Sequence, residues 1–428
     1  MAKLEVTLKQ HTPLIHFESD IEGATLRATE LKSKLDKFLI EHFQKESIDY
    51  SNYLIKGQKK SFNYKVKIKN VKNYDKEDIE KNKIKNGKIE YKRSGQPKKI
   101  NFPLFFANLG EENKDKFFSY CDNLEVEFFS FKKEVIEKIR DLLPEFLFLN
   151  NFGTRQSKGF GSFFINDELI YKLNQENKKY EENVMKKLKE SYPYFEVKTD
   201  KEGIEVYKNY KKLFYKIELF YKSLRSGINQ VKNGESVFYF KSLIFLYAKD
   251  KNIQWDKKSI KEAYFSKNLK KEQTKHKGNK ELEKYLIKDL LGLSKEESWM
   301  TYNGNITKEN NCSDKKKSID RFQSPIFFKP IRAKNENKFQ VFFKGNNNSQ
   351  ILDKEFIIKN NGVGNLKLST PKKFDINDFF KCIFEKNIFD EGEDKYVEKK
   401  FQNRSEFKEL REIYEKIRNK KYKRLGDK

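Results

Sequence analysis

The stretch FGTRQSKGFGSF, residues 152–163, packs three glycines, an arginine and a lysine between two apolar segments. Glycine lets the main chain adopt positive φ and approach a ligand closely. The side chains of Arg155 and Lys158 can donate charge-assisted hydrogen bonds to anionic oxygens. The stretch is therefore typical of a loop that holds a phosphate backbone. A tight helix-to-strand turn that uses glycine as a C-cap has the same composition, and the sequence leaves both interpretations open.

The segments that flank this loop predict an α+β domain. Residues 124–128 alternate apolar and polar as in a strand, and residues 131–149 have helical periodicity, so the order is strand, helix, glycine-rich loop, strand. At the start of the chain, residues 4–10 alternate in the same way and lead to a helix that we expect to begin near Thr29, an N-cap residue type. Together these elements predict a ferredoxin-like (RRM-like) domain over residues 1–200.

A lysine-rich region from about residue 50 to 106 predicts basic hairpins inserted in this domain. Apolar residues recur at every second position from Phe62 to Ile68, and Asn86-Gly87 is a dipeptide preferred in two-residue hairpin turns. The alternation of lysine with aromatic residues could follow a single-stranded nucleic acid. A solvated surface hairpin explains the same pattern equally well.

The second half, residues 201–428, predicts a second α+β domain of the ferredoxin-like type. Its first part, about residues 205–300, is a mostly helical segment in which apolar residues from Leu213 to Ile228 share one face. The run RFQSPIFFKPI at residues 321–331 and the run FQVFFKG that follows predict a hairpin. A basic helix is expected near the C-terminus.

The charge of the chain favours a polyanionic partner. Lys+Arg number 91 against 64 Asp+Glu, which gives a formal net charge of +27. Such an imbalance attracts polyanions by long-range attraction and counterion release, so nucleic acid is the first candidate partner. An AT-rich coding background would also enrich lysine, so the charge supports this partner without proving it.

Arginine is the rarer cation, with 11 residues against 80 lysines. A guanidinium makes bidentate contacts to phosphate and stacks on bases, which an ammonium cannot do. Four arginines lie in the most motif-like segments: Arg27, Arg155, Arg225 and Arg321. Better packing of arginine at these positions is the alternative explanation.

Several classes of protein are disfavoured. The three cysteines are far apart and form no CxxC pair, which indicates a reducing cytoplasm. The four histidines do not combine with these cysteines at any spacing typical of zinc ligands, so we expect no metal and no cofactor. No apolar run approaches the ~20 residues that span a bilayer, and the chain opens on a strand-like segment, so we expect a cytoplasmic protein without a membrane partner.

Three segments together resemble the RAMP superfamily of CRISPR-associated proteins. The loop GTRQSKGFGS, residues 153–162, is similar to that family's glycine-rich loop of the GxGxxxxGFGS kind. The opening strand, Thr12-Pro13-Leu14 and the run LRATELKSKL resemble the family's first motif, although Ser33 stands where a glycine is usual. The run RFQSPIFFKPI at residues 321–331 resembles a strand with an arginine and an SPL motif, which is found in the second half of the proteins of one branch of this superfamily. The set is most similar to the first subunit of the type III-B Cmr effector complex, a two-domain RAMP protein.

This resemblance implies a non-catalytic subunit that works beside other RAMP subunits in antiviral defence. It would grip CRISPR RNA, or the duplex of guide and complementary target RNA, through the backbone, while base pairing provides the sequence recognition. Arg225 is included only because arginine is rare here and because a Ser-Gly pair follows it. The predicted RNA-binding residues are Arg27, Lys32, Gly153, Arg155, Lys158, Gly159, Gly161, Arg225 and Arg321.

Two nuclease hypotheses and one unrelated RNA-binding hypothesis compete with this interpretation. Asp20 is placed like the aspartate with which some RAMP subunits cut target RNA using a divalent metal. His16 could instead act as general base on a 2′-hydroxyl, as in metal-independent RAMP endoribonucleases that process CRISPR transcripts. An RRM-like protein outside CRISPR systems would stack bases on sheet aromatics, for which Phe160 is the obvious candidate.

Overall fold

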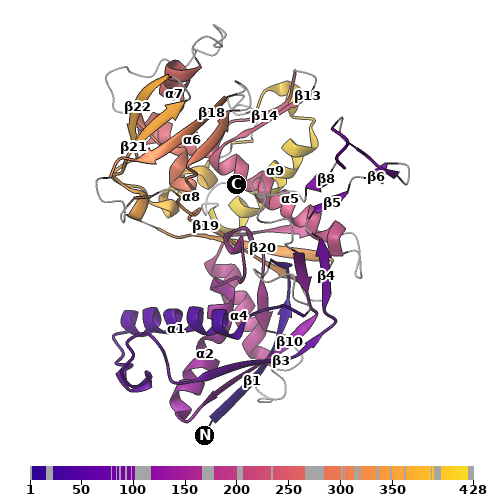
Figure 1. Ribbon diagram of the computed structural model, residues 1–428, viewed down its shortest axis with the longest axis vertical. Coiled ribbons are helices and arrows are strands. Elements are labelled where there is room, and N and C mark those ends of the chain that lie inside the picture. The colour runs from indigo at the N-terminus through magenta and orange to yellow at the C-terminus, as the bar shows by residue number, and fades with distance from the viewer. Residues whose placement is uncertain are drawn as a thin grey trace. The chain divides into compact units, whose positions relative to one another are not determined.

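The fold is a mixed α/β structure in two compact units (Figure 1). Unit 1 comprises Met1–Glu218 and Phe328–Phe343, and unit 2 comprises Leu219–Phe327 and Lys344–Lys428. The computed structural model describes residues 2–422 apart from 16–22, 79, 83, 86–87, 92–93, 98, 102–116, 166–177, 200–205, 233–234, 266–283, 300–301, 303, 313–317, 320, 334–336, 348, 361–362, 387 and 390–396.

Unit 1 is built on a four-stranded antiparallel sheet with the strand order β11-β1-β10-β3. Along the chain the order is strand, helix, two strands, helix, strand. The elements are β1 (Ala2–Gln10), α1 (Ala28–Lys45), β3 (Lys65–Lys72), β10 (Asn123–Ser130), α2 (Lys133–Leu149) and β11 (Phe163–Ile165).

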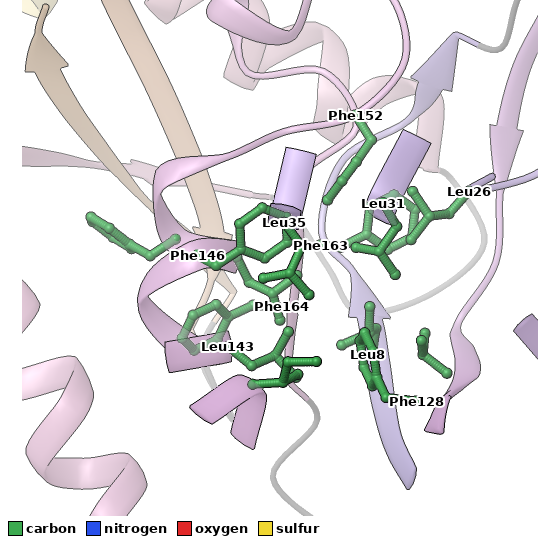
Figure 2. Packing of buried hydrophobic residues seen from close by; sticks show 14 of the residues in the cluster. Leu8, Leu26, Leu31, Leu35, Phe128, Leu143, Phe146, Phe152, Phe163 and Phe164 are labelled. Carbon is green, nitrogen blue, oxygen red and sulfur yellow. The ribbon is translucent and has the colours of Figure 1, made fainter. Parts of the chain in front are cut away.

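The apolar periodicity of the sequence accounts for these elements. Leu4 and Leu8 of β1 and Phe128 of β10 point to one face of the sheet, because side chains alternate along a strand. Helices α1 and α2 cover that face with apolar residues spaced three or four apart, such as Leu31 and Leu35. Figure 2 shows Leu8, Leu31, Leu35 and Phe128 packed together with the phenylalanines of β11.

Helix α1 begins close to the predicted position near Thr29, but its N-cap residue differs from the prediction. The helix begins at Ala28, with Arg27 in the N-cap position and no side-chain cap, so Thr29 lies inside the first turn. An acidic residue of that turn, Glu30, binds the main chain of the glycine-rich loop instead of capping its own helix. A tertiary contact therefore stabilises this end of the helix.

The lysine-rich region is only partly an insertion, because its residues 65–72 form β3 of the four-stranded sheet and the strands that follow form nested antiparallel pairs. Strand β4 pairs with β9, which also pairs with β2, while β5 pairs with β8 and β6 with β7. The expected Asn86-Gly87 turn lies outside the described residues. The bounds are β2 (Leu14–Ile15), β4 (Asp75–Asp78), β5 (Glu80–Asn82), β6 (Ile84–Lys85), β7 (Lys88–Ile89), β8 (Lys99–Asn101) and β9 (Phe117–Tyr120).

Unit 1 extends beyond the predicted boundary at residue 200. Strand β12 (Tyr194–Lys198) pairs with β20 (Lys338–Gly345), which pairs in turn with β19 (Ile326–Arg332). The predicted hairpin of the second half thus exists, but most of it completes a sheet of unit 1. Helix α4 (Lys178–Ser191) precedes β12, and α5 (Val206–Arg225) leads from unit 1 into unit 2.

Unit 2 contains a six-stranded mixed sheet in the order β15-β16-β22-β21-β18-β17 and the separate pair β13-β14. Strands interrupt the segment that was predicted as mostly helical. The strands are β13 (Ile228–Lys232), β14 (Glu235–Phe240), β15 (Gln254–Trp255), β16 (Lys284–Tyr285), β17 (Glu296–Trp299), β18 (Gly304–Asn310), β21 (Glu355–Asn360) and β22 (Val363–Ser369).

The helices of unit 2 include the C-terminal helix that the sequence predicts, although the excess of basic residues lies in the turn that follows it. They are α6 (Leu243–Asp250), α7 (Lys257–Tyr264), α8 (Ile376–Glu385) and α9 (Ser405–Ile417), after which the chain continues in a wider turn, Arg418–Tyr422. Within the described part of the chain, none of the helices combines the length and the apolar composition that a bilayer span requires. A ferredoxin-like arrangement of this unit stays a prediction.

Candidate functional site at the glycine-rich loop

The loop between α2 and β11 has a left-handed backbone at four positions. Gly153, Arg155, Gly159 and Gly161 have φ values of 74°, 56°, 91° and 63°. Such values are common for glycine and uncommon for a side chain as large as that of arginine. Between Arg155 and Gly159 the chain makes one short 3₁₀ turn, η3 (Gln156–Lys158). The main chain therefore reverses direction within a few residues.

The glycines lie against the protein's own backbone. A Cβ atom on Gly153 would lie 2.7 Å from the carbonyl oxygen of Ile15, and one on Gly161 would lie 2.0 Å from that of Phe152. Gly159 is similarly close to Pro330. The close approach that these residues permit is thus made by the chain itself. Their predicted direct contact with RNA stays a prediction.

Residues 12–15, which belong to the opening motif of the chain, hydrogen-bond to the main chain of the loop. The amide of Gly161 donates to the carbonyl oxygen of Pro13 at 2.7 Å, and that of Thr154 donates to Ile15 at 3.0 Å. The hydroxyl of Thr12 donates to the carbonyl oxygen of Gly159 at 2.7 Å and accepts from the amide of Ser162 at 2.9 Å. The opening motif is therefore in direct contact with the loop, and the third segment that carries the family resemblance also reaches it, since Ser162 donates to the carbonyl oxygen of Pro330 at 2.7 Å.

A buried asparagine and a buried lysine fix the loop from the other side. Nδ2 of Asn151 donates to the carbonyl oxygens of Gln156 and Phe328, both at 2.8 Å. The ammonium of Lys329, only 1% exposed, donates to the carbonyl oxygens of Asn150 and Phe163 at 2.8 and 2.9 Å and to Oδ1 of Asn151 at 3.1 Å. Burial lowers the pKa of Lys329 well below its ordinary value.

A second lysine joins the loop to α1. Nζ of Lys34 donates to the carbonyl oxygen of Asn151 and to Oε1 of Gln156, both at 2.6 Å, and lies 2.9 Å from Oε1 of Glu30. Glu30 in turn accepts from the amide of Gly153 at 3.0 Å. Burial is the main cause that lowers the pKa of Lys34. The loop is thus tied to the first helix by one cation and one anion.

Sequence reasoning missed both lysines. Lys329 interrupts the apolar run PIFFKPI, and a lysine inside a buried strand is itself a signal, because it must find hydrogen-bond acceptors. Lys34 lies within the opening motif, but the loop residues that it binds, Asn151 and Gln156, are far along the chain. Only the folded structure identifies it.

Two of the predicted RNA-binding residues, Arg27 and Arg155, have accessible side chains around this loop. Arg155 is half-buried, and burial lowers the pKa of its guanidinium to about 10, so it stays charged at neutral pH. Lys158 ends η3, and its side-chain nitrogen is buried. Arg27 is exposed one helical turn before Glu30, at the end of α1 that contacts the loop. The structure therefore brings Arg27, Arg155 and Lys158 to one region of unit 1.

The other predicted cations are placed differently. The ammonium of Lys32 binds Oδ2 of Asp36 at 2.7 Å and the carbonyl oxygen of Phe62 at 3.0 Å. The guanidinium of Arg225 donates to the carbonyl oxygen of Gly292 at 2.7 and 3.1 Å. Arg321 is exposed. Arg225 and Arg321 both belong to unit 2. RNA contacts by these three residues stay predictions, and protein partners already hold the first two.

The residues of the competing hypotheses give no further site. Asp20 and His16 lie outside the described residues. Within the described part of the chain, no group of three or more His, Cys, Asp and Glu side chains is placed to hold a metal ion. Phe160 is fully buried and stacks on Phe214, with ring centroids 3.9 Å apart, so it belongs to the core and offers no surface for a base.

Both halves of the chain are similar in sequence to a known family of proteins. A family model described as the Cmr1 N-terminal domain matches residues 1–228, and one described as the Cmr1 C-terminal domain matches residues 239–419. The crystal structure of apo Cmr1 from Pyrococcus furiosus is similar with 13% identity and a TM-score of 0.34, over 81% of this chain and 89% of that chain. No curated protein sequence matches the chain.

The two family matches cover most of the chain, and together with the mixed α/β fold they define a CRISPR-associated RAMP protein of type III-B. The chain belongs to the Cmr1 family. Membership of this family supports a place as one subunit of a multi-subunit type III-B Cmr complex.

Proposed function

We propose that this chain is a non-catalytic subunit that grips the backbone of the guide RNA, or of the guide–target duplex, within a cytoplasmic Cmr complex. The observation that carries the proposal is the construction of the loop. Its glycines and its bonds to residues 12–15 hold Arg155 in a left-handed conformation beside Lys158. A loop fixed before binding loses little conformational freedom when RNA arrives.

The chemistry of the loop suits a phosphate backbone. A half-buried guanidinium is partly desolvated, so a charge-assisted hydrogen bond to a phosphate oxygen gains more there than at a fully hydrated site. Backbone contacts position an RNA without selecting its sequence, which is what a protein needs when base pairing selects the target. The net charge of +27 adds long-range attraction.

We also propose that unit 1 is a ferredoxin-like RAMP domain with a basic hairpin insertion. The support is the order strand-helix-strand-strand-helix-strand along the chain, together with the sheet order β11-β1-β10-β3. In this arrangement the insertion lies between the second and third strands of the motif. The chain would act with other RAMP subunits in antiviral defence.

The loop assignment is tested by the double variant Arg155→Ala/Lys158→Ala. Fluorescence anisotropy with labelled single-stranded RNA should show weaker binding, by about ten-fold or more at moderate salt, because two phosphate contacts are lost. The matched control is Lys37→Ala/Arg140→Ala, which removes one lysine and one arginine from exposed helix surfaces of the same unit. Unchanged affinity in a double variant with a wild-type thermal melt would contradict the assignment.

A further inference from the structure

The face of the four-stranded sheet opposite α1 and α2 carries an exposed phenylalanine. Phe131, directly after β10, is 75% exposed. Its ring packs edge-on against that of Phe129, with centroids 5.4 Å apart and planes at 76°. The residues that face the same way on the neighbouring strands are mostly charged, so the two phenylalanines stand out on this surface.

The backbone that carries Phe131 is held firmly. The hydroxyl of Ser130 donates to the carbonyl oxygen of Asn63 at 2.6 Å and accepts from the amide of Lys132 at 3.0 Å. The ammonium of Lys132 donates to the carbonyl oxygen of Asn52. The bonds on both sides of Phe131 therefore fix the main chain that carries the exposed ring.

The charges around the phenylalanines are not balanced. Phe129 lies in register between Lys3 and Lys65. Lys3 is paired with Glu5 at 2.7 Å and with Glu127 at 2.8 Å. Glu127 is also bound by Lys69 from β3, and two cations hold its pKa at about 2. Glu5 and Glu127 are thus occupied by Lys3 and Lys69, and the third acidic group of this face, Glu125, accepts a hydrogen bond from Asn70 at 2.7 Å.

Two exposed lysines are left over. Within the described part of the chain, Lys65 and Lys67 on β3 have no ion-pair partner. Lys65 is the direct cross-strand neighbour of Phe129, and Lys67 is its diagonal neighbour, within about 8 Å. We call Phe129, Phe131, Lys65 and Lys67 the Phe131 face. It combines an aromatic ring held in solvent with unneutralised positive charge.

We propose that the Phe131 face is a second contact surface for single-stranded RNA, separate from the glycine-rich loop. A base stacks on the ring of Phe131, and the adjoining phosphates lie against Lys65 and Lys67. The proposal rests on the RNA-binding function proposed above. Stacking on an aromatic ring beside lysines is sequence-tolerant, because every base has a π-face.

The surroundings favour RNA over a protein partner. A protein interface usually has a contiguous apolar centre of several hundred Å². On the Phe131 face one exposed ring stands among charged side chains, which leaves too little apolar area for such a centre. A single exposed ring is enough for one RNA base to stack on, and the lysines beside it can bind the phosphates of the RNA backbone.

The variant Phe131→Trp tests stacking directly. The chain has two tryptophans, Trp255 and Trp299, and both belong to unit 2. Titration with a single-stranded oligoadenylate should quench the fluorescence of the introduced indole well beyond the change in wild type. Phe131→Leu keeps an apolar side chain without the ring, and should weaken binding of the same RNA by roughly ten-fold. Phe131→Tyr should bind like wild type.

The variant Lys65→Gln/Lys67→Gln tests the charge contribution. The slope of log affinity against log salt should fall by about 1.4, or ~0.7 for each lost phosphate contact with a single strand. The control Lys37→Gln/Lys187→Gln changes the same charge on exposed helix surfaces and should leave the slope near wild type.

These experiments distinguish failure of the Phe131 face from failure of the glycine-rich loop as an RNA-binding site. Wild-type RNA affinity for Phe131→Leu, without quenching in Phe131→Trp, overturns the inference, while the Arg155→Ala/Lys158→Ala variant still tests the loop. Loss of association with other Cmr subunits at unchanged RNA affinity would assign the face to a protein and also overturn it. Absence of any RNA binding by the wild-type chain would refute both proposals.

Discussion

The imidazole of His11 accepts a hydrogen bond at Nδ1 from the main-chain amide of Arg332, at 3.0 Å. An acceptor nitrogen carries no proton, so His11 is neutral with its proton on Nε2. Its side chain is buried, and burial, followed by the charge of Lys329, holds its pKa well below 6.5. This bond joins the end of the first strand to β19, more than 300 residues later.

Mild acid should destabilise the chain through His11. The unfolded histidine takes up a proton below about pH 6.5, whereas the folded one does not, so the stability that this site contributes is lost as the pH falls through 6.5. Urea unfolding at pH 7.5 and 5.5 should show a larger loss for wild type than for His11→Asn, by up to about 1.4 kcal/mol per pH unit. Parallel pH dependence of the two proteins would contradict this prediction.

Replacing Lys329 by methionine should destabilise unit 1. The variant keeps the length of the side chain but leaves three buried oxygens, on Asn150, Asn151 and Phe163, without their donor. We expect a loss of about 2 kcal/mol or more in the free energy of unfolding, measured with urea. Lys187→Met, at an exposed position of α4, should change it by less than about 0.5 kcal/mol. A wild-type value for Lys329→Met would show that the three bonds contribute nothing net.

The substitution Gly161→Ala should disturb the loop. The new methyl group would need the space of the Phe152 carbonyl oxygen, at a φ of 63° that alanine adopts poorly. A loss of about 2 kcal/mol or more in stability should accompany weaker RNA binding. Gly364→Ala is the control, because a Cβ there meets no atom within 4 Å. If both variants melt like wild type, the loop does not need glycine at position 161.

Unit 2 should lose stability as the pH rises toward neutrality. Asp256 is buried, and burial, followed by the charge of Asp289, raises its pKa to about 7. Lys308, Lys288 and Glu297 also face it. Because the folded state binds this proton between about pH 4 and 7 and the unfolded state does not, the contribution of Asp256 is lost as the pH rises through that window. Asp256→Asn resembles the protonated form, so it should escape the loss, roughly 3 kcal/mol between pH 4 and 8 by urea unfolding.

Replacement of Asp20 or His16 by alanine should leave RNA cleavage by the assembled complex intact, because the proposed role is binding alone. The measurement is the rate of target-RNA cutting and of guide-RNA maturation with each variant at normal assembly. Loss of cutting with Asp20→Ala would favour the metal-dependent nuclease hypothesis. Loss of maturation with His16→Ala would favour the processing nuclease.

Local patterns in the sequence predict the local structure well. The strand at residues 4–10 and the helix at residues 131–149 follow from periodicity alone, and so does the loop between α2 and β11. The N-cap of α1 was misplaced, because Glu30 bonds to the loop and not to its own helix. Propensity describes a segment by itself and cannot include such a tertiary partner.

Distant contacts account for the rest. Unit 1 takes in part of α5 and most of the β19–β20 hairpin, which the predicted boundary at residue 200 leaves to the second domain, because β20 pairs with β12 across about 140 residues of chain. Lys329 escaped notice because its three acceptors come from the loop region. The sequence predicts a backbone with positive φ at the glycines, and the structure has it. The groups that approach Gly153 and Gly161 closely are the main-chain carbonyls of Ile15 and Phe152 in the same chain.

The bonds of Lys329 to the glycine-rich loop also set an order of events during synthesis. At about 5–20 residues per second, the ribosome delivers Lys329 on the order of ten seconds or more after Phe163, to which it must bond. Until then the loop has its N-terminal support but lacks its buried cation. The glycine-rich loop of a nascent chain is therefore finished only when about three-quarters of the protein has been made, so a truncated chain that ends before β19 would carry the motif without its folded shape.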